Sequence, residues 1–467
     1  MVTAWRSTLS IPPSNVFCAN HSPRCIPGRW IESDRKRSRP RWLKPAWDVA
    51  AASPGPPGLQ AAQQAPAMPP SATTHHPAPA LSNDSSLLQG CEPGPRLRVA
   101  ALLSGGVDSS VALALAQRAG HEVHAFYLQI WFQEDFRNTW ASCPWEEDLE
   151  QCREVCRALG DIPLHVVPLT AEYWALVVEE CIAGVRRGRT PNPDMLCNSR
   201  VKFGAFHAWL ARQEPAFDRI ASGHYARVER GGAGGTGEAT PHLATSPDAV
   251  KDQTYFLSRL SGEQLARCMF PLGHLQKTQV RQLAAELELP NAARRESQGL
   301  CFLGHVRFDE FIREHLGDWP GPIVEEESDT VLGYHRGFWF HTLGQRKGVP
   351  LHGGPWYVTR KDIELNIVYV SRAYHEAPRP DRSTFRVSQL QWHRRPEAAG
   401  PAAALQLRCK ARHGPDSVAC TLEMADADSA SGVVSLATPD QGLAPGQFAV
   451  FYKDDICCGS GVIEGGL

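Results

Sequence analysis

The sequence predicts an α/β protein that begins with a parallel sheet and ends with a small antiparallel barrel. Residues 97–103 (LRVAALL) form an apolar run of strand length, and a Ser-Gly-Gly turn at 104–106 ends it before a helix-forming segment. A second apolar run, 121–131 (HEVHAFYLQIW), follows as the next strand. A strand, a helix and a strand in this order open a parallel sheet. After about residue 380, short runs of alternating apolar and polar residues predict antiparallel strands.

The turn at 104–106 is a candidate anion site. Asp108 or Ser109 can cap the helix that follows it, and Gly120 can end that helix. Glycines let backbone N–H groups approach an anion, and a helix N-terminus adds partial positive charge. The pattern GxxxxGK[ST] is absent, so this is not a Walker loop. Phosphate binding and an ordinary strand–helix turn both fit the spacing.

The composition excludes several classes of protein. The 467 residues suggest about three domains, and 42% hydrophobic with 21% charged content excludes a wholly disordered chain. The net charge of −2 gives no global attraction to nucleic acid, so a polyanion partner requires a local basic patch. The 14 cysteines have no repeating framework, which favours a reducing compartment. No apolar run reaches the roughly 18 residues of a membrane-spanning helix, so no membrane partner is expected.

Residues 1–95 are predicted to be a disordered leader and linker. The first fifty residues are rich in Arg and Ser, and residues 51–86 are rich in Ala and Pro with no Lys or Arg. This composition resembles an organellar transit peptide, which predicts a mitochondrial or chloroplast protein without distinguishing the two. A disordered tail that targets nothing is the alternative.

Two cysteines stand in unusual surroundings. Cys197 follows Asp194 in GRTPNPDMLCNSRVKFGAF (188–206), and Cys301 lies in RRESQGLCFLGHVRFDEF (294–311). Basic neighbours lower the pKa of a thiol and make it more nucleophilic. Small core residues are the alternative reading of both cysteines. The basic residues around the two motifs also favour contact with RNA; they are Arg186, Arg187, Arg189, Arg200, Lys202, Arg294 and Arg295.

Seven motifs together resemble one enzyme family. SGGVDSS, GRTPNPDMLCN, GHYAR, KDQTYFL, ESQGLCFLG, HTLGQRKG and APGQFAVFY occur in this order. They are similar to the tRNA uridine 2-sulfurtransferases, the MnmA/TrmU family of the PP-loop ATP pyrophosphatases, here of an organellar, plant or algal type. The resemblance covers residues 97–467. It implies a PP-loop catalytic domain at 96–306, a small central domain at 307–378 and a tRNA-binding β-barrel at 379–467.

The resemblance also implies an activity, which is ATP-dependent thiolation of the wobble uridine of tRNA at ring position 2. The base is adenylated, and a cysteine persulfide supplies the sulfur of 2-thiouridine. Cys301 would carry the persulfide, Cys197 would attack it and leave a disulfide or assist the transfer, and Asp194 would orient the base or move a proton. ATP and Mg²⁺ are the implied cofactors. The implied partners are the tRNA anticodon stem-loop and a sulfur donor, either a sulfur-relay protein or a cysteine desulfurase.

The matching motifs imply binding residues as well. The nucleotide would contact Leu102, Leu103, Ser104, Gly105, Gly106, Val107, Asp108, Ser109, Leu128 and Gly223. The tRNA would contact Asn192, Pro193, Asp194, His224, Lys251, Asp252, Gln253, Lys410 and Gln447. Lys410 stands where the family usually has Arg, and Ala411 where Tyr is common, so this contact departs from the family pattern.

Other readings remain open. A ligating PP-loop synthetase would use the same turn but leave both cysteines idle, and a tRNA-binding protein without activity would use neither. Cys143, Cys152 and Cys156 have no standard zinc spacing, so we expect core packing and no metal site. An iron–sulfur cluster on Cys197, Cys301 and Asp194 is conceivable, but three ligands do not establish it. The Gly-rich stretch 230–250 is expected to be a surface loop.

Overall fold

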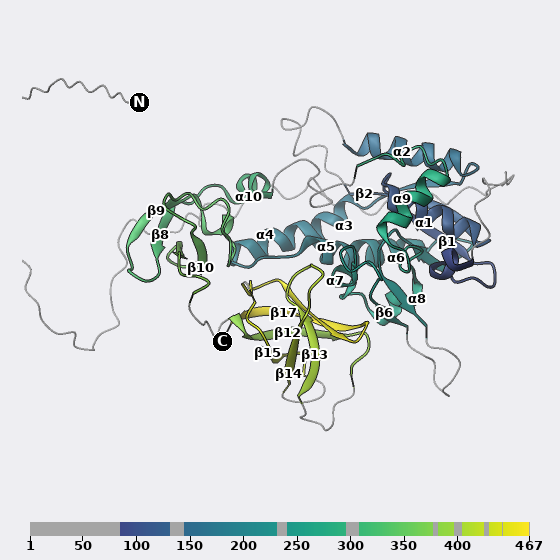
Figure 1. Ribbon diagram of the computed structural model, residues 1–467. Coiled ribbons are helices and arrows are strands. Elements are labelled where there is room, and N and C mark those ends of the chain that lie inside the picture. The colour runs from purple at the N-terminus through teal and green to yellow at the C-terminus, as the bar shows by residue number, and fades with distance from the viewer. Residues whose placement is uncertain are drawn as a thin grey trace, which may run out of the picture. The chain divides into compact units, whose positions relative to one another are not determined.

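The structure, a computed structural model, describes residues 85–130, 144–230, 241–295, 308–376, 382–396, 404–424, 429–440 and 442–466. All of them belong to one compact unit, Ala67–Leu467. They form three sheets, of five, four and eight strands, together with the helices that cover them (Figure 1). Within these ranges, no helix has the length and apolar character needed to cross a membrane.

The five-stranded sheet is parallel, as predicted. Its order is β3-β2-β1-β4-β7, and its strands are β1 (Arg98–Leu102), β2 (Glu122–Gln129), β3 (Leu164–Pro168), β4 (Arg219–Ala221) and β7 (Cys268–Met269). The chain adds β2 and β3 on one side of β1, and β4 and β7 on the other. The connections that follow β1 and β4 therefore run in opposite directions. Open parallel sheets bind ligands at the point where this happens.

Successive residues of the strands belong to two separate cores, because their side chains point to opposite faces of the sheet. Ala100 and Phe126 belong to one core, whereas Val99, Ala101 and Ala125 belong to the other. The second core is covered by α1 (Val107–Arg118), α2 (Pro144–Ala158) and α9 (Lys277–Glu286). Cys152 and Cys156 of α2 lie in this core, with exposed fractions of 0% and 4%, which confirms the expected core packing of these two. Cys143 lies outside the described residues, so its packing stays a prediction.

The predicted linker ends earlier than residue 95. A 3₁₀ helix, η2 (Ser85–Cys91), packs against α1 and buries Cys91 completely. Glu92 follows it and pairs with Arg219 at 3.0 Å and Arg230 at 2.6 Å. The apolar pair Leu87 and Leu88 packs on the α1 core, which gives this short segment enough buried surface to order. The rest of the leader lies outside the described residues.

The first core is covered by a run of short helical segments. They are α3 (Thr170–Tyr173), η3 (Trp174–Val178), α4 (Glu179–Arg186), α5 (Pro193–Leu196), η4 (Cys197–Ala205) and α6 (Phe206–Leu210). Both η3 and η4 are π-helical. Such turns are rare and occur frequently at functional sites. The chain continues through α7 (Thr254–Leu257) and α8 (Gly262–Arg267) to β7.

A four-stranded sheet follows α10 (Phe308–Leu316). Its order is β10-β11-β8-β9, and its strands are β8 (Gly321–Glu325), β9 (Val331–His335), β10 (Tyr357–Asp362) and β11 (Ile367–Ser371). The 3₁₀ helix η5 (Phe338–Phe340) lies between β9 and β10 in the chain. Ile323, Val358 and Val370 are buried in a core of its own. This sheet corresponds to the predicted small central domain.

The last strands close into an antiparallel barrel, as predicted. They are β12 (Thr384–Trp392), β13 (Leu405–Lys410), β14 (Val418–Glu423), β15 (Gly432–Leu436), β16 (Phe448–Lys453) and β17 (Ile456–Gly466). The ring closes because β12 pairs with both β15 and β17. The side chains of β13 alternate between buried and exposed from Leu405 to Arg408, which is the period-two pattern of its sequence.

A hairpin that precedes α7 in the chain extends the barrel sheet. The strands β5 (Arg227–Glu229) and β6 (His242–Ala244) pair with each other, and β6 pairs with β17 through Leu243 and Ala244. The stretch expected to be a surface loop at 230–250 therefore contains a buried strand. Its Gly-rich middle, 231–240, lies outside the described residues.

Candidate functional site

The glycine turn lies at the carboxyl end of β1, directly before α1. Gly105 has a φ of +75°, and a Cβ there would come within 2.8 Å of Asp148 O and 2.9 Å of Arg294 Nη1. A side chain at this position would therefore meet both strain and a clash. Gly106 is the N-cap of α1 and makes no side-chain cap hydrogen bond. Because the first turn of a helix has N–H groups with no intrahelical acceptor, this end of α1 suits an anion.

The loop after β4 meets the same end of α1. A Cβ on Gly223 would lie 2.7 Å from Ser109 N and 2.8 Å from Asp108 C, so only glycine allows this approach. Leu128 lies near the end of β2, which pairs with β1, and is half-buried. The residues that the sequence assigns to a nucleotide are thus brought together at one edge of the sheet.

Asp108 and Ser109 do not cap α1, because the helix begins at Val107 and they lie inside its first turn. The Ser109 hydroxyl instead donates to Gly106 O at 2.9 Å and accepts from Ser104 N at 3.2 Å. The Asp108 carboxylate accepts from Lys277 Nζ at 2.7 and 2.9 Å and from the Tyr225 hydroxyl at 3.0 Å. A lysine side chain is therefore fixed beside the turn.

Three residues that the sequence reasoning did not assign to the nucleotide hold the turn in place. Asn291 Nδ2 and Arg294 Nη1 donate to Gly105 O at 2.8 and 3.0 Å. Arg294 Nη2 also donates to Asp148 Oδ1 at 2.6 Å. Burial raises the pKa of Asp148, although the hydrogen bond and charge of Arg294 oppose the rise. Arg294 stabilises the glycine turn through these hydrogen bonds, and its expected approach to Cys301, which lies outside the described residues, stays a prediction.

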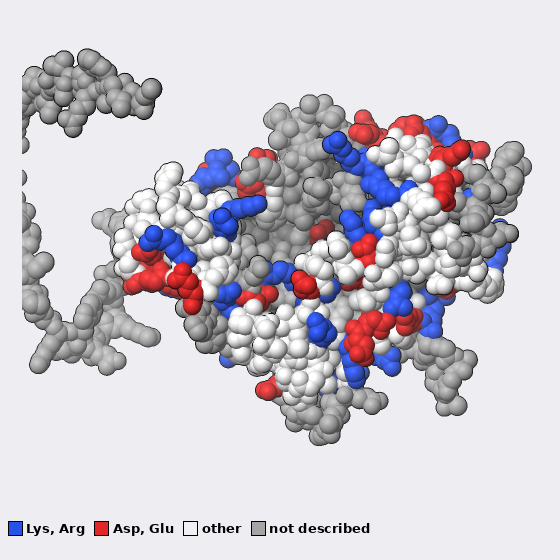
Figure 2. All heavy atoms as spheres, in the orientation of Figure 1, with Lys and Arg blue, Asp and Glu red and all other residues white. Residues whose placement is uncertain are grey.

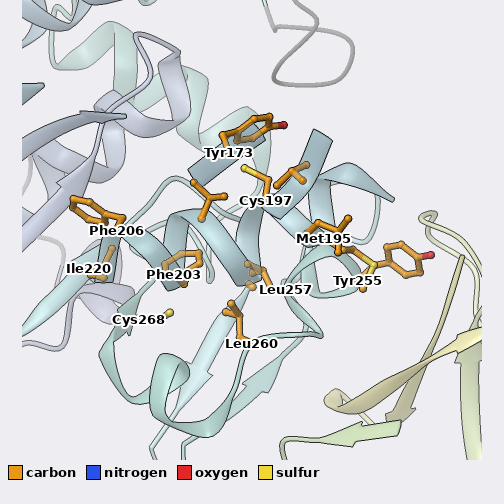
Figure 3. Close-up of a cluster of buried hydrophobic side chains, with 14 of the residues drawn as sticks. Tyr173, Met195, Cys197, Phe203, Phe206, Ile220, Tyr255, Leu257, Leu260 and Cys268 are labelled. Atoms are coloured by element: carbon orange, nitrogen blue, oxygen red, sulfur yellow. The ribbon is translucent and has the colours of Figure 1, made fainter. Parts of the chain in front are cut away.

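Asp194 and Cys197 follow a well-defined helix start. Asn192 caps α5 by accepting from Met195 N at 3.2 Å, and Pro193 occupies the first turn. Cys197 is the C-cap of α5 and the first residue of η4, and it is 2% exposed. Figure 3 shows it beside Tyr173 among apolar side chains. Cys301 lies outside the described residues, so the predicted approach of the two thiols stays a prediction.

Gln447 is the one predicted tRNA contact of the barrel that meets the Asn192 segment. Its amide hydrogen-bonds Thr190 O, Pro191 O and the side chains of Asn192 and Tyr255. Residues 190–192 of the catalytic domain and the loop before β16 are therefore in direct contact.

Two other predicted tRNA contacts pair with each other. Lys410 Nζ lies 3.4 Å from Asp252 Oδ2, and the two side chains are 7% and 3% exposed. Asp252 also accepts from Ser246 N at 3.1 Å and from the Thr254 hydroxyl at 2.7 Å. In this conformation the pair joins the segment before α7 to the end of β13. Neither side chain offers surface to an RNA.

The remaining predicted tRNA contacts are partly enclosed. Gln253 Oε1 accepts from Tyr225 N at 2.9 Å, and Lys251 is half-buried. The His224 ring bonds the Ser222 hydroxyl at 2.8 Å. Burial, with a smaller effect from the Lys202 charge, lowers the pKa of His224 to about 3. His224 is therefore neutral at neutral pH and meets a ligand as a polar ring rather than as a cation.

The basic residues near the first cysteine motif have protein partners whether or not they are exposed. Arg189 binds Glu464 at 2.5 Å, the exposed Arg187 lies 3.8 Å from Glu180, and the exposed Arg200 donates to Leu176 O at 3.1 Å. On the face drawn in Figure 2, basic and acidic side chains are interspersed, as the near-zero net charge leads one to expect.

Comparison with known proteins assigns the chain to a family. Three family models match in order: the tRNA methyl transferase HUP domain at residues 97–305, the tRNA methyl transferase PRC-barrel domain at 309–372 and the aminomethyltransferase beta-barrel domain at 382–463. The tRNA-specific 2-thiouridylase MnmA of Porphyromonas gingivalis is 40% identical over 388 residues, which cover 79% of this chain and 99% of the relative. The enzyme of the same name from Parabacteroides distasonis is 40% identical over 379 residues, with the same coverage.

Among solved structures, a 4-thiouridine synthetase–RNA complex with bound ATP matches 47% of this chain and 50% of that chain at 17% identity, with a TM-score of 0.28. A similarity this low adds nothing to the assignment. The sequence relatives decide it, because they are matched over almost their whole length. The chain belongs to the family of tRNA-specific 2-thiouridylases called MnmA.

Proposed function

We propose that the protein thiolates the wobble uridine of tRNA at ring position 2, with ATP as the activator of the base and a cysteine persulfide as the sulfur source. The observation that carries this proposal is the junction of the 104–106 turn with Gly223 at the end of α1. It forms a phosphate site in a chain whose 40%-identical relatives are named tRNA-specific 2-thiouridylases.

The first step uses this junction. The phosphates of ATP would lie against the first-turn N–H groups of α1, with the exposed Ser104 and the Lys277 ammonium beside them. The uridine O2 attacks the α phosphorus, the bond to the bridging oxygen breaks, and pyrophosphate leaves. Leu128, half-buried at the end of β2, would pack on the adenine. Asn291 and Arg294 keep the turn in the binding geometry before ATP arrives.

Mg²⁺ would be held by the phosphates of ATP rather than by a cluster of side chains from the described residues. The described part of the chain contains no group of three His, Cys, Asp or Glu side chains that could hold a metal. The Asp108 carboxylate, in the first turn of α1, is already bound by Lys277. We therefore assign no step to a protein-bound metal ion.

The second step transfers sulfur. The Cys197 thiolate attacks the inner sulfur of a persulfide on Cys301, and a Cys197–Cys301 disulfide forms as hydrosulfide is released. Hydrosulfide attacks C2 of the adenylated base, and AMP leaves. Asp194, on the same helical turn as Cys197, would orient the base or accept a proton. A thiol reductant returns two electrons to the disulfide, and a sulfur-relay protein or a cysteine desulfurase reloads Cys301.

The substrate must present its base to this site. A wobble base in a folded anticodon loop has to leave the stack, and Asn192-Pro193-Asp194 would receive it. His224, Lys251, Gln253 and Gln447 remain proposed contacts of the anticodon stem-loop, together with Asp252 and Lys410 if their pair opens. The leader composition supports action in a mitochondrion or chloroplast.

Cysteine variants test the chemistry. Cys197→Ser and Cys301→Ser should each abolish 2-thiouridine formation in a tRNA transcript, measured by mass spectrometry of the nucleosides, and should leave ATP binding unchanged. Cys268→Ser is the matched control, because Cys268 is fully buried in the same core as Cys197 and carries no proposed chemistry. Undiminished thiolation in both test variants would remove the persulfide mechanism, whereas an inactive control would point to core damage instead.

A further inference from the structure

The helix that begins at Cys197 is wound more loosely than an α-helix. In η4 the backbone follows the π pattern, in which an N–H group binds the carbonyl five residues earlier, and the bond from Phe206 N to Val201 O has this spacing. An α-helix binds the carbonyl four residues earlier. A change from the π pattern to the α pattern therefore shifts one part of the segment by one residue against the other. Such a shift is a rotation of about 100° and a translation of about 1.5 Å.

Gly204 allows the wide turn that spans residues 199–204. A Cβ on Gly204 would lie 2.9 Å from Ser199 O, the carbonyl five residues earlier. Glycine is otherwise one of the least favourable residues in the interior of a helix. A methyl group at this position would push the two backbone positions apart. An alanine would thus disfavour the π pattern at the wide turn.

Gln264 of α8 binds the wide turn through both hydrogens of its side-chain amide. Nε2 donates to Ser199 O at 2.8 Å and to Phe203 O at 2.9 Å. Oε1 accepts from Ser261 N at 2.8 Å, which completes the capping box of α8. One side chain therefore fixes the start of α8 and also two carbonyls of η4.

The position of the wide turn determines where Cys197 lies. After the turn, the rings of Phe203 and Phe206 are buried in the first core, which holds this end of the segment (Figure 3). Before it, the Asn192 cap holds the start of α5. Closing the wide turn would displace the residues between these two ends, and Cys197 and Asp194 are among them.

We propose that Gln264 is a positioning residue for the sulfur-transfer step: together with Gly204, it keeps η4 in the π pattern and so sets the direction of the Cys197 thiol. The inference rests on the proposed role of Cys197 as a nucleophile. Gln264 acts through the backbone of η4 at Ser199 and Phe203. Its loss should leave the binding of ATP and tRNA intact and slow the reaction, because misplacing a reacting group by about 1 Å costs up to about 100-fold in rate.

Two substitutions of Gln264 separate this role from the cap of α8. Gln264→Glu keeps an acceptor for Ser261 N but loses both donors to η4, whereas Gln264→Lys keeps donors and loses the acceptor. For Gln264→Glu we expect a kcat for thiolation lower by about 10- to 100-fold, with the KM for ATP and the Kd for tRNA within about twofold. Gly204→Ala should behave in the same way. The kcat of Gln264→Lys should stay within about threefold of the wild-type value, whereas a residue that only caps α8 would show the opposite order.

The rate at which iodoacetamide alkylates Cys197, followed by mass spectrometry, reports on the thiol without any turnover. The thiol is 2% exposed, so its displacement should raise this rate in Gln264→Glu and in Gly204→Ala. Gln279→Glu is the matched control and should change neither alkylation nor kcat. Gln279 also completes a capping box, by accepting from Gln276 N at 2.8 Å. It is exposed, and its side chain has no hydrogen bond to a second helix in the part of the chain that the structure describes.

The alkylation readout keeps this inference separate from the proposed function. If the wild-type protein thiolates no tRNA but alkylation of Cys197 rises in both test variants, the function is wrong and the positioning role stands. If Gln264→Glu does not fold, Gly204→Ala decides by the same two readouts. Unchanged alkylation and kcat in the test variants would refute the positioning role. A Gln264→Lys variant as impaired as Gln264→Glu, or a higher Kd for tRNA at constant kcat, would refute it as well.

Discussion

The buried pair of Asp252 and Lys410 supports a quantitative prediction. Lys410→Met removes the cation and leaves the Asp252 carboxylate 3% exposed. Breaking a buried ion pair by removing one partner costs about 3–5 kcal/mol, because the remaining charge loses its compensation. Here the carboxylate keeps two donors, Ser246 N and the Thr254 hydroxyl. We therefore expect the low end of that range, about 3 kcal/mol.

Urea unfolding followed by circular dichroism measures the loss. With a slope of about 2 kcal/mol/M, a loss of about 3 kcal/mol lowers the midpoint by about 1.5 M. Adding Asp252→Asn removes the second charge and should restore most of the loss. Lys453→Met is the matched control, because Lys453 is an exposed lysine of the same barrel and its loss should change the free energy of unfolding by no more than about 0.5 kcal/mol.

The same variant decides whether the pair acts on the RNA. Unfolding of Lys410→Met at the wild-type midpoint, together with a tenfold higher Kd for tRNA, would refute a purely structural role of the pair. That result would mean that Lys410 leaves Asp252 and faces the substrate.

Two further predictions concern the residues around the glycine turn. Gly223→Ala places a methyl group 2.7 Å from Ser109 N, so it should raise the KM for ATP about tenfold, the equivalent of about 1.4 kcal/mol. Gly262→Ala is the control, because a Cβ there meets no atom within 4 Å. An unchanged KM in Gly223→Ala would contradict the close approach. The half-buried His224 has a pKa lowered to about 3, whereas an unfolded histidine has a pKa of about 6.5. The unfolded chain therefore binds the extra proton between these values, and stability rises with pH through that window. The urea midpoint of His224→Gln should therefore rise less steeply with pH than that of the wild type between about pH 4 and pH 7. Equal slopes for the two proteins would contradict a lowered pKa of His224.

The fold was predictable where hydrophobic periodicity determines it. The run at 97–103 and the alternation in β13 and β14 gave the parallel sheet and the barrel, and the structure confirms both. The predicted domain boundaries at 306/307 and 378/379 fall in segments outside the described residues, so they stay predictions. The hairpin β5–β6 was missed because its strands are three residues long, too short for a period-two pattern to be recognised.

The candidate site was predictable from motifs but its supports were not. Lys277 reaches Asp108 across 169 positions, and Asn291 reaches Gly105 across 186. A side chain that donates to a distant backbone carbonyl leaves no local pattern in the sequence. The resemblance likewise named Gln447, Asp252 and Lys410 but could not reveal that their polar atoms face protein groups. The partners of such residues are determined by the folded chain, because they come from distant parts of the sequence.

The pairing of β6 with β17 affects how this chain can be divided. By sequence β6 lies in the catalytic half, but by hydrogen bonding it is a strand of the barrel sheet. A fragment ending before the barrel would keep β6 with one edge open, and open edges promote association between molecules. The barrel is therefore not an exchangeable module, whereas the connection between β5 and β6 can change in length cheaply, since each doubling of a loop costs only about 0.6 kcal/mol.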